Sequence, residues 1–248
     1  LEELDKTQQQ VMVWLNDPAH NPTGLSMSEQ GRIACLETFV DSALNNENVG
    51  HTLLIDSAYS LYADEPFAWA DTILNEIENG MMWPDNLLIC VAVSLSKSHT
   101  IYGLRTGALV SMHPEKEVTD RLDTVMSVTG RQTWSATPRV AQFCVSEMHS
   151  SEEGGKAWSD ERDRLKDLLD NRRNILNSEC EKLGVSINPT MDGFFAWIES
   201  SDPIAVAEKC AENDVFLVPL NGGVRIGLCA LPTDSIPKVA MALSKAMS

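Results

Sequence analysis

Short apolar runs of strand length alternate along the chain with segments in which apolar residues recur every three or four positions. The short runs are typical of buried β-strands, and the second pattern predicts helices with one apolar face. Together they predict an α/β fold, with helices covering both faces of a sheet. A capping box at Ser26 and Glu29 indicates where the first long helix begins. In the first half of the chain we expect strands at 11–15, 52–55, 87–93 and 108–112, helices at 26–44 and 67–78, and further helices from about 114 and 138.

The later part of the chain opens with a long charged segment, residues 155–183, in which Leu and Ile recur at helical spacing. We expect one long helix that joins two domains. The residues beyond it predict a small α/β domain, with strands at 193–199, 215–220 and 224–228 and helices at 203–213 and from about 234. The expected organisation is part of a large domain at 1–154, a connecting helix at 155–184 and a small C-terminal domain at 185–248.

The composition bears on which partners the protein can bind and on where it is located. A formal net charge of −17 argues against nucleic acid or an anionic membrane surface as a partner, because both attract clustered Lys and Arg. The six cysteines are scattered without a C-x-x-C pair and indicate reduced core residues of a cytoplasmic protein. No apolar run approaches the ~18 residues that a membrane span needs, and the polar start is unlike a signal peptide. Because the chain begins with Leu and reaches a strand by Val11, we expect it to be the later part of a longer polypeptide.

Three of the expected strands end in loops rich in polar side chains. The first loop, residues 16–24, contains two prolines and a glycine that fix the backbone and aim Asn21, although it also suits a plain turn before a helix. The second loop begins with Asp56 and reaches Tyr59; taken alone, it favours an aspartate that caps the next turn. Because the carboxyl ends of parallel strands open on one edge of a sheet, we expect the loops to converge on a ligand site.

Lys97 is the most informative residue of the chain. It closely follows seven apolar residues, 87–93, so we expect it near the core rather than in solvent. Ser94 and Ser96 precede it, and Arg105 lies eight residues later in a stretch flanked by glycines. An amine condenses with an aldehyde to a Schiff base, while hydroxyls and a guanidinium can hold phosphate. The set predicts a site for a phosphorylated aldehyde cofactor, which is the chemistry of pyridoxal phosphate.

With these loops the chain resembles the class I aminotransferases of fold type I, which are pyridoxal-phosphate-dependent enzymes. The resemblance rests on HNPTG at 20–24, DSAY at 56–59, SLSK at 94–97, GLRTG at 103–107 and VRIG at 224–227. It extends from about Val11 to the C-terminus, and the stretch from Lys97 to Arg105 is its most specific part. It implies an α/β fold of three layers around a mostly parallel sheet, incomplete here, and a small C-terminal α/β domain.

The resemblance also implies a role for each candidate residue. Lys97 would form the Schiff base and move the proton between the substrate Cα and the cofactor. Arg225 would bind the substrate α-carboxylate in a bidentate fork, with Asn21 beside it, although an arginine within a strand can also pair across the sheet. The groups that would hold the cofactor are Asp56 at the pyridine nitrogen, Asn21 and Tyr59 at the ring oxygen, and Ser94, Ser96 and Arg105 around the phosphate.

Arg131 bears on the substrate. It lies in GRQTWS at 130–135, a stretch similar to the one where aspartate and aromatic aminotransferases place an arginine that reaches the partner subunit's site. This implies a homodimer and an acidic or aromatic amino acid as substrate, with a 2-oxoacid; an exposed arginine ending a helix is the alternative. The family's N-terminal portion, which supplies a phosphate-binding helix N-terminus and a ring that stacks on the cofactor, has no counterpart before Val11.

Three hypotheses follow. The leading one is a pyridoxal-phosphate-dependent aminotransferase with a ping-pong mechanism. The second keeps the cofactor but catalyses β-elimination or decarboxylation, because the same electron sink serves these reactions. The third is a catalytically silent, truncated relative that acts as an interaction module. The five histidines lack metal-ligand spacing, and no nucleophile elbow, P-loop or dinucleotide fingerprint favours a hydrolase, NTPase or dehydrogenase.

Overall fold

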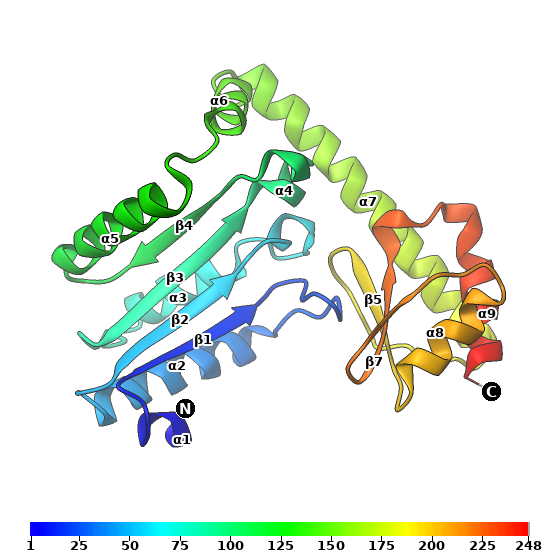
Figure 1. Cartoon of the computed structure of the whole chain (residues 1–248), viewed down its shortest axis with the longest axis horizontal. Helices are drawn as coiled ribbons and strands as arrows, with labels where there is room; N and C mark the ends of the chain where they lie inside the picture. The colour runs from blue at the N-terminus through cyan, green and yellow to red at the C-terminus, as the bar shows by residue number, and fades with distance from the viewer. Residues whose placement is uncertain (248) are drawn as a thin grey trace. The chain divides into compact units, whose positions relative to one another are not determined.

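The computed structural model describes residues 1–247, which form two compact units. Each unit has one sheet and its own hydrophobic core, and Figure 1 traces the chain through both. The first unit comprises Leu1–Asp17, Met27–Ala58 and Phe67–Trp158, and the second comprises Pro18–Ser26, Tyr59–Pro66 and residues 159–247.

The sheet of the first unit has four strands in the order β1-β2-β3-β4 (Figure 1). The first three strands run parallel and the fourth runs antiparallel to β3. The prediction of an α/β fold with a mostly parallel sheet is therefore confirmed. The bounds are β1 (Gln10–Asn16), β2 (Gly50–Asp56), β3 (Leu87–Ser94) and β4 (Gly107–Met112), with α2 (Glu29–Asn45) between β1 and β2 and α3 (Ala68–Glu78) between β2 and β3.

Side-chain alternation decides which face of this sheet is buried. In β2, Leu53 and Ile55 are fully buried, whereas the residues between and beside them are only partly buried. They belong to one core cluster with Leu36 of α2 and Ile73 of α3. The apolar positions of the strands thus fix α2 and α3 on one face of the sheet.

The opposite face carries exposed apolar side chains. Met12 and Trp14 of β1 are 62% and 66% exposed, and Leu109 of β4 is 44% exposed. The strand register places all three on the face opposite Leu53. Within residues 1–247, the helix layer expected on this second face does not bury these side chains, and α5 (Lys116–Trp134) has no buried residue.

The start of α2 differs from the sequence prediction. Its N-cap is Ser28, whose Oγ accepts a hydrogen bond from the backbone N–H of Gly31 at 3.1 Å. The hydroxyl of Ser26 instead accepts from the N–H of Ala19 at 2.9 Å and donates to Asp192 at 2.6 Å. The capping box at Ser26 is therefore wrong, because a tertiary partner takes up that hydroxyl.

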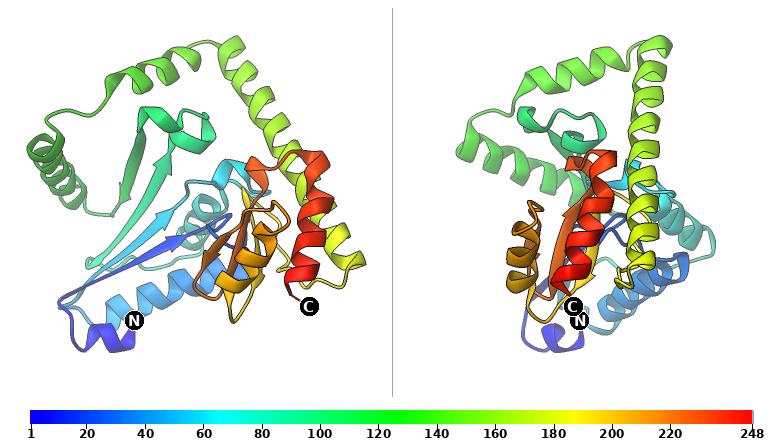
Figure 2. Two further views of the ribbon diagram at one scale, coloured as in Figure 1. Left: turned by 45° about the vertical axis from the view of Figure 1, so that its right-hand side comes forward. Right: turned by 90° about the vertical axis from the view of Figure 1, so that its right-hand side faces the viewer.

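The long helix expected at 155–183 is α7 (Glu152–Lys182), a single helix of 31 residues. Its residues belong to both units, and it is the longest ribbon in the views of Figure 2. No helix among residues 1–247 is both long enough and apolar enough to cross a lipid bilayer. The other helices of the first unit are α1 (Glu2–Asp5), α4 (Leu95–Ser98), α6 (Arg139–Met148) and the 3-10 turn η2 (Tyr102–Leu104).

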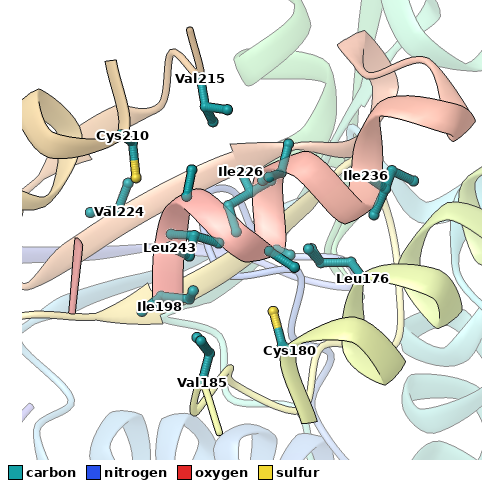
Figure 3. Close-up of a cluster of buried hydrophobic side chains, with 14 of the residues drawn as sticks. Leu176, Cys180, Val185, Ile198, Cys210, Val215, Val224, Ile226, Ile236 and Leu243 are labelled. Carbon is teal, nitrogen blue, oxygen red and sulfur yellow. The ribbon is translucent and has the colours of Figure 1, made fainter. Parts of the chain in front are cut away.

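The second unit is built on three antiparallel strands in the order β5-β7-β6. Its core, drawn in Figure 3, joins side chains of these strands to helices, as Ile198 and Ile226 pack with Leu176 and Leu243. The strand expected at 215–220 is shorter than predicted. The bounds are β5 (Phe195–Glu199), β6 (Val218–Leu220), β7 (Gly223–Gly227), α8 (Pro203–Ala211), α9 (Ile236–Ala246) and the 3-10 turns η1 (Ser60–Tyr62), η3 (Leu228–Ala230) and η4 (Thr233–Ser235).

All six cysteines are free thiols. Cys90, Cys180 and Cys210 are buried, and burial raises the pKa of each thiol, that of Cys180 to about 11. Cys144 and Cys229 are exposed, so the expectation of core positions is wrong for these two.

Replacement of Leu53 by alanine tests the buried face. We expect Leu53→Ala to lower the free energy of unfolding by ~2–5 kcal/mol, because a fully buried side chain leaves a cavity between the sheet and its helices. Leu74→Ala is the matched control, since Leu74 lies on α3 with 57% of its surface exposed, and should change stability by no more than ~0.5 kcal/mol. Urea unfolding measures both; equal effects would contradict the assigned faces.

Candidate functional site

The carboxyl ends of three strands meet at one edge of the first sheet. Asn16 of β1 pairs with Asp56 of β2, and Asp56 pairs in turn with Ala92 of β3. Two residues further, Ser94 ends β3 and α4 begins, carrying Lys97. The parallel register thus brings the candidate carboxylate and the candidate lysine segment to adjacent strand ends, which is where α/β sheets bind ligands.

The Asp56 carboxylate is half-buried and has fixed partners. Its Oδ1 accepts from the backbone N–H of Ala58 at 3.1 Å, and its Oδ2 accepts from Nε1 of Trp14 at 3.3 Å. The side chain of Asn16 donates to the Asp56 carbonyl at 2.8 Å. Trp14 is not among the site residues predicted from the sequence, although a period of two places it on the same face of β1 as Asn16.

Lys97 lies on a helix of one turn, α4, and is half-buried. Ser94 caps this helix, since its Oγ accepts from the backbone N–H of Ser96 at 3.3 Å. Ser98 closes the turn by donating its hydroxyl to the Ser94 carbonyl at 3.1 Å. The Ser96 residue is 6% exposed. Both predicted serines therefore lie within the turn that carries the lysine.

Arg105 follows this turn and is exposed. Its backbone is left-handed, with a φ of 53°, and its Nη1 donates to the Tyr102 carbonyl at 2.8 Å. Position 107 requires glycine for steric reasons, because a Cβ there would lie 2.4 Å from the Val93 carbonyl oxygen. This contact reflects the pairing of β4 with β3, which turns the chain back beside the lysine segment.

In the second unit, Arg225 and Asn21 contact each other although 204 residues separate them. The Arg225 Nη1 donates to Oδ1 of Asn21 at 2.9 Å, and its guanidinium carbon lies 4.5 Å from the centre of the Phe195 ring. The residues directly opposite Arg225 in the sheet are Trp197 and Val218, and neither carries a carboxylate. Tyr59 is buried, with its ring edge-on to Phe195 at 5.7 Å.

The loop that carries Asn21 is fastened to the second sheet. Gly24 has a φ of 70°, and a Cβ on it would lie 2.3 Å from the Phe195 carbonyl oxygen. Within the loop, His20 Nδ1 and Thr23 Oγ1 lie 2.8 Å apart. The HNPTG sequence therefore suits a tight loop that only glycine can complete at its last position. Phe195 was not among the sequence candidates.

Arg131 stands apart from these groups. It lies in the last turn of α5, is exposed, and its carbonyl accepts from the N–H of Ser135 at 3.1 Å. This position suits both sequence hypotheses, an arginine that ends a helix and one that extends outward.

Residues 1–243 match the family model described as aminotransferase class I and II. The curated relatives include an aromatic-amino-acid aminotransferase of Paracoccus denitrificans, 26% identical over 94% of this chain and 56% of the relative. A cytoplasmic aspartate aminotransferase of Gallus gallus is 27% identical over 100% of this chain and 57% of the relative. The chain thus spans somewhat more than half the length of these relatives.

Solved structures show the same likeness. An aminotransferase from Anaerococcus prevotii superposes with a TM-score of 0.89 at 26% identity, covering 99% of this chain and 58% of that one. An aromatic-amino-acid aminotransferase from Burkholderia pseudomallei, covalently bound to pyridoxal phosphate, gives a TM-score of 0.79 over 100% of this chain and 59% of that one. At 22% identity, the second comparison shows the fold alone.

Gly24→Ala tests the loop geometry. We expect a loss of ~2 kcal/mol or more in the free energy of unfolding, because alanine is strained at positive φ and its Cβ would meet the Phe195 carbonyl. Gly130→Ala is the control: in the interior of α5 an added Cβ meets nothing within 4 Å, so stability should stay equal or rise by ~0.5–1 kcal/mol. A harmless Gly24→Ala in urea unfolding would refute the close approach.

Proposed function

Because the chain belongs to the aminotransferase class I and II family, we propose that it carries the lysine and the substrate-binding groups of a pyridoxal-phosphate-dependent aminotransferase. Such an enzyme moves an amino group from an amino acid to a 2-oxoacid. The observation that carries the proposal is the placement of Asp56 and the Lys97 turn at adjacent ends of parallel strands. An amine and a carboxylate at one sheet edge are what this cofactor requires.

The donor set fits the cofactor. Asp56 would hold the pyridine nitrogen, and an indole N–H and a backbone N–H fix the position of its carboxylate. Arg105 and the hydroxyls of the α4 turn would hold the phosphate, and Asn21 and Tyr59 the ring oxygen. When bound, pyridoxal phosphate supplies an electron sink that makes the Cα–H bond of the amino acid labile.

Lys97 would act as the base and acid that moves the proton at the substrate Cα. A primary amine suits this work because its nitrogen can accept a proton from one atom and donate it to another. Its helix turn is half-buried and capped at Ser94, which limits the positions open to the amine. Proton transfer gains from this restriction, since a misplacement of about 1 Å can cost ~100-fold in rate.

Arg225 would bind the α-carboxylate of the substrate. A guanidinium has five N–H donors, and the bond from Nη1 to Asn21 uses one of them. The Phe195 ring supports the guanidinium plane at 4.5 Å. Asn21 therefore orients the arginine while leaving donors for a bidentate bond to a carboxylate.

We also infer the class of substrate, the oligomeric state and the cellular location of the protein. The relatives named above are aspartate and aromatic-amino-acid aminotransferases, and one is named as cytoplasmic, so we infer an acidic or aromatic amino donor and a cytoplasmic protein. Arg131, exposed at the end of α5, would reach the site of a second subunit in a homodimer and bind a distal carboxylate. In a ping-pong reaction, the donor amino acid leaves as a 2-oxoacid before the second 2-oxoacid binds.

Covalent labelling tests the lysine. We expect pyridoxal phosphate followed by borohydride to leave a pyridoxyl group on Lys97, located by peptide mass spectrometry, because the amine condenses with the aldehyde. Lys97→Ala should abolish this label. Lys116→Ala, at a lysine whose side chain is 83% exposed on α5, should leave it intact. A label that persists in Lys97→Ala at another position would remove the proposed role.

Kinetics with two donors test Arg131. We expect Arg131→Ala to lower kcat/KM for aspartate roughly 10- to 100-fold, because a charge-assisted hydrogen bond to the distal carboxylate is lost. An aromatic donor should lose less than about threefold, since it has no distal carboxylate. Arg121→Ala, at an exposed arginine on the same helix, is the control and should affect neither donor. Equal losses for both donors would exclude a distal-carboxylate role.

A further inference from the structure

Three aromatic side chains from separate segments of the first unit meet at the end of the helix that carries Lys97. His99 directly follows α4, and its ring stacks on Trp158 of α7, with 4.8 Å between ring centres and 17° between planes. His149, just after α6, is edge-on to both rings, at 5.4 Å from His99 and 4.8 Å from Trp158. The proposed function gives none of the three a role.

Taking the Ser98 hydroxyl as the donor to the Ser94 carbonyl sets the direction of the other hydrogen bonds in this cluster. Ser98 has one hydroxyl hydrogen, which it donates to the Ser94 carbonyl at 3.1 Å. Its oxygen is therefore the acceptor in the 2.8 Å contact with Nδ1 of His99. With the proton on Nδ1, Nε2 of neutral His99 carries a lone pair, so Nε2–H of His149 donates to it across 3.1 Å.

The charge state of His99 agrees with this direction. Burial, together with the neighbouring His149, lowers the pKa of His99 below its ordinary value. A neutral ring with a free lone pair at Nε2 is the form that the contact with His149 needs. The chain of bonds therefore runs from His149 through His99 and Ser98 to the start of α4.

A fourth bond fastens the other side of the turn. Nε1 of Trp158 donates to the backbone carbonyl of Ser98 at 3.2 Å. Helices as short as α4, with four residues, are unstable in isolation, and their last carbonyls need partners from elsewhere. Trp158 supplies such a partner one residue after Lys97. The backbone that carries the amine is thus held by side chains from outside its own segment.

We propose that His99, His149 and Trp158 are positioning residues for Lys97, which act by holding the α4 turn in one place. The role given to Lys97 rests on the proposed function, whereas the bonds themselves do not depend on it. The ring stacking fixes the orientation of His99, the His149 donor fixes its Nε2, and the indole N–H fixes the Ser98 carbonyl. Lys97 needs this support because reacting groups must be held to within a fraction of an ångström.

Three variants separate the effect of losing a hydrogen-bond donor from the effect of changing side-chain size. Trp158→Phe keeps an aromatic ring beside His99 but removes the N–H donor to Ser98. His149→Leu replaces the donor to His99 with an apolar side chain of similar size, whereas His149→Gln offers an amide N–H at the same place. Trp134→Phe is the matched control, because Trp134 lies on α5 with 70% of its surface exposed.

The first measurement is amide hydrogen exchange of the chain without cofactor. We expect Trp158→Phe and His149→Leu to speed exchange in residues 95–99 about five- to tenfold, the effect of losing one hydrogen bond on local opening. His149→Gln and Trp134→Phe should stay within about twofold of the unsubstituted chain. Exchange in β2 should not change in any variant, which separates local release from global unfolding. Unchanged exchange in residues 95–99 of both Trp158→Phe and His149→Leu would overturn the proposal.

The second measurement is the initial rate of pyridoxyl labelling at Lys97. We expect Trp158→Phe and His149→Leu to lower it at least about fivefold and His149→Gln to restore it, following the same hydrogen bonds. Faster exchange without slower labelling would mean that the cluster only stabilises the fold, which would overturn a positioning role. A chain that takes no label at Lys97, with exchange as expected, would refute the proposed function and leave the support of the α4 turn established.

Discussion

The parallel, in-register pairing of β1, β2 and β3 is the constraint on which the candidate site of the first unit depends. Leu53 and Ile55 of β2 are buried against α2 and α3, so the alternation of the strand turns Asp56 to the opposite face. There it meets Trp14, whose position on β1 has the same parity. A slip of one residue would bury the carboxylate and expose the leucine, so core packing itself fixes the face of Asp56.

The same physics places the arginine of the second unit. Val224 and Ile226 of β7 are fully buried, and Arg225 between them must face the other side of the strand. That side carries the Phe195 ring and Asn21, which hold the guanidinium. In both units a charged group is therefore aimed by buried apolar residues of its own strand, Leu53 and Ile55 in β2 and Val224 and Ile226 in β7.

Much of this arrangement could be predicted from periodicity and short motifs. The expected strands at 52–55 and 87–93 and the long helix at 155–183 lie within a few residues of the observed elements. The prediction is wrong at the start of α2, where either of two serines has the side chain that an N-cap needs. Ser26 and Ser28 can each cap a helix, and the bond from Ser26 to Asp192 decided which one does. A partner 166 residues away leaves no local signal in the sequence.

Local sequence patterns are enough to predict the α/β class, the order of the elements and the residue types at the strand ends, because hydrophobic period and turn chemistry are local properties of a chain. The side chains that hold these groups in place become apparent only in the folded molecule. These side chains come from distant segments of the chain: Trp14 bonds to Asp56, Asn21 to Arg225, and Trp158 to the α4 turn. Such contacts depend on strand register and helix packing. Both are set when the whole core forms, so no single stretch of residues predicts them.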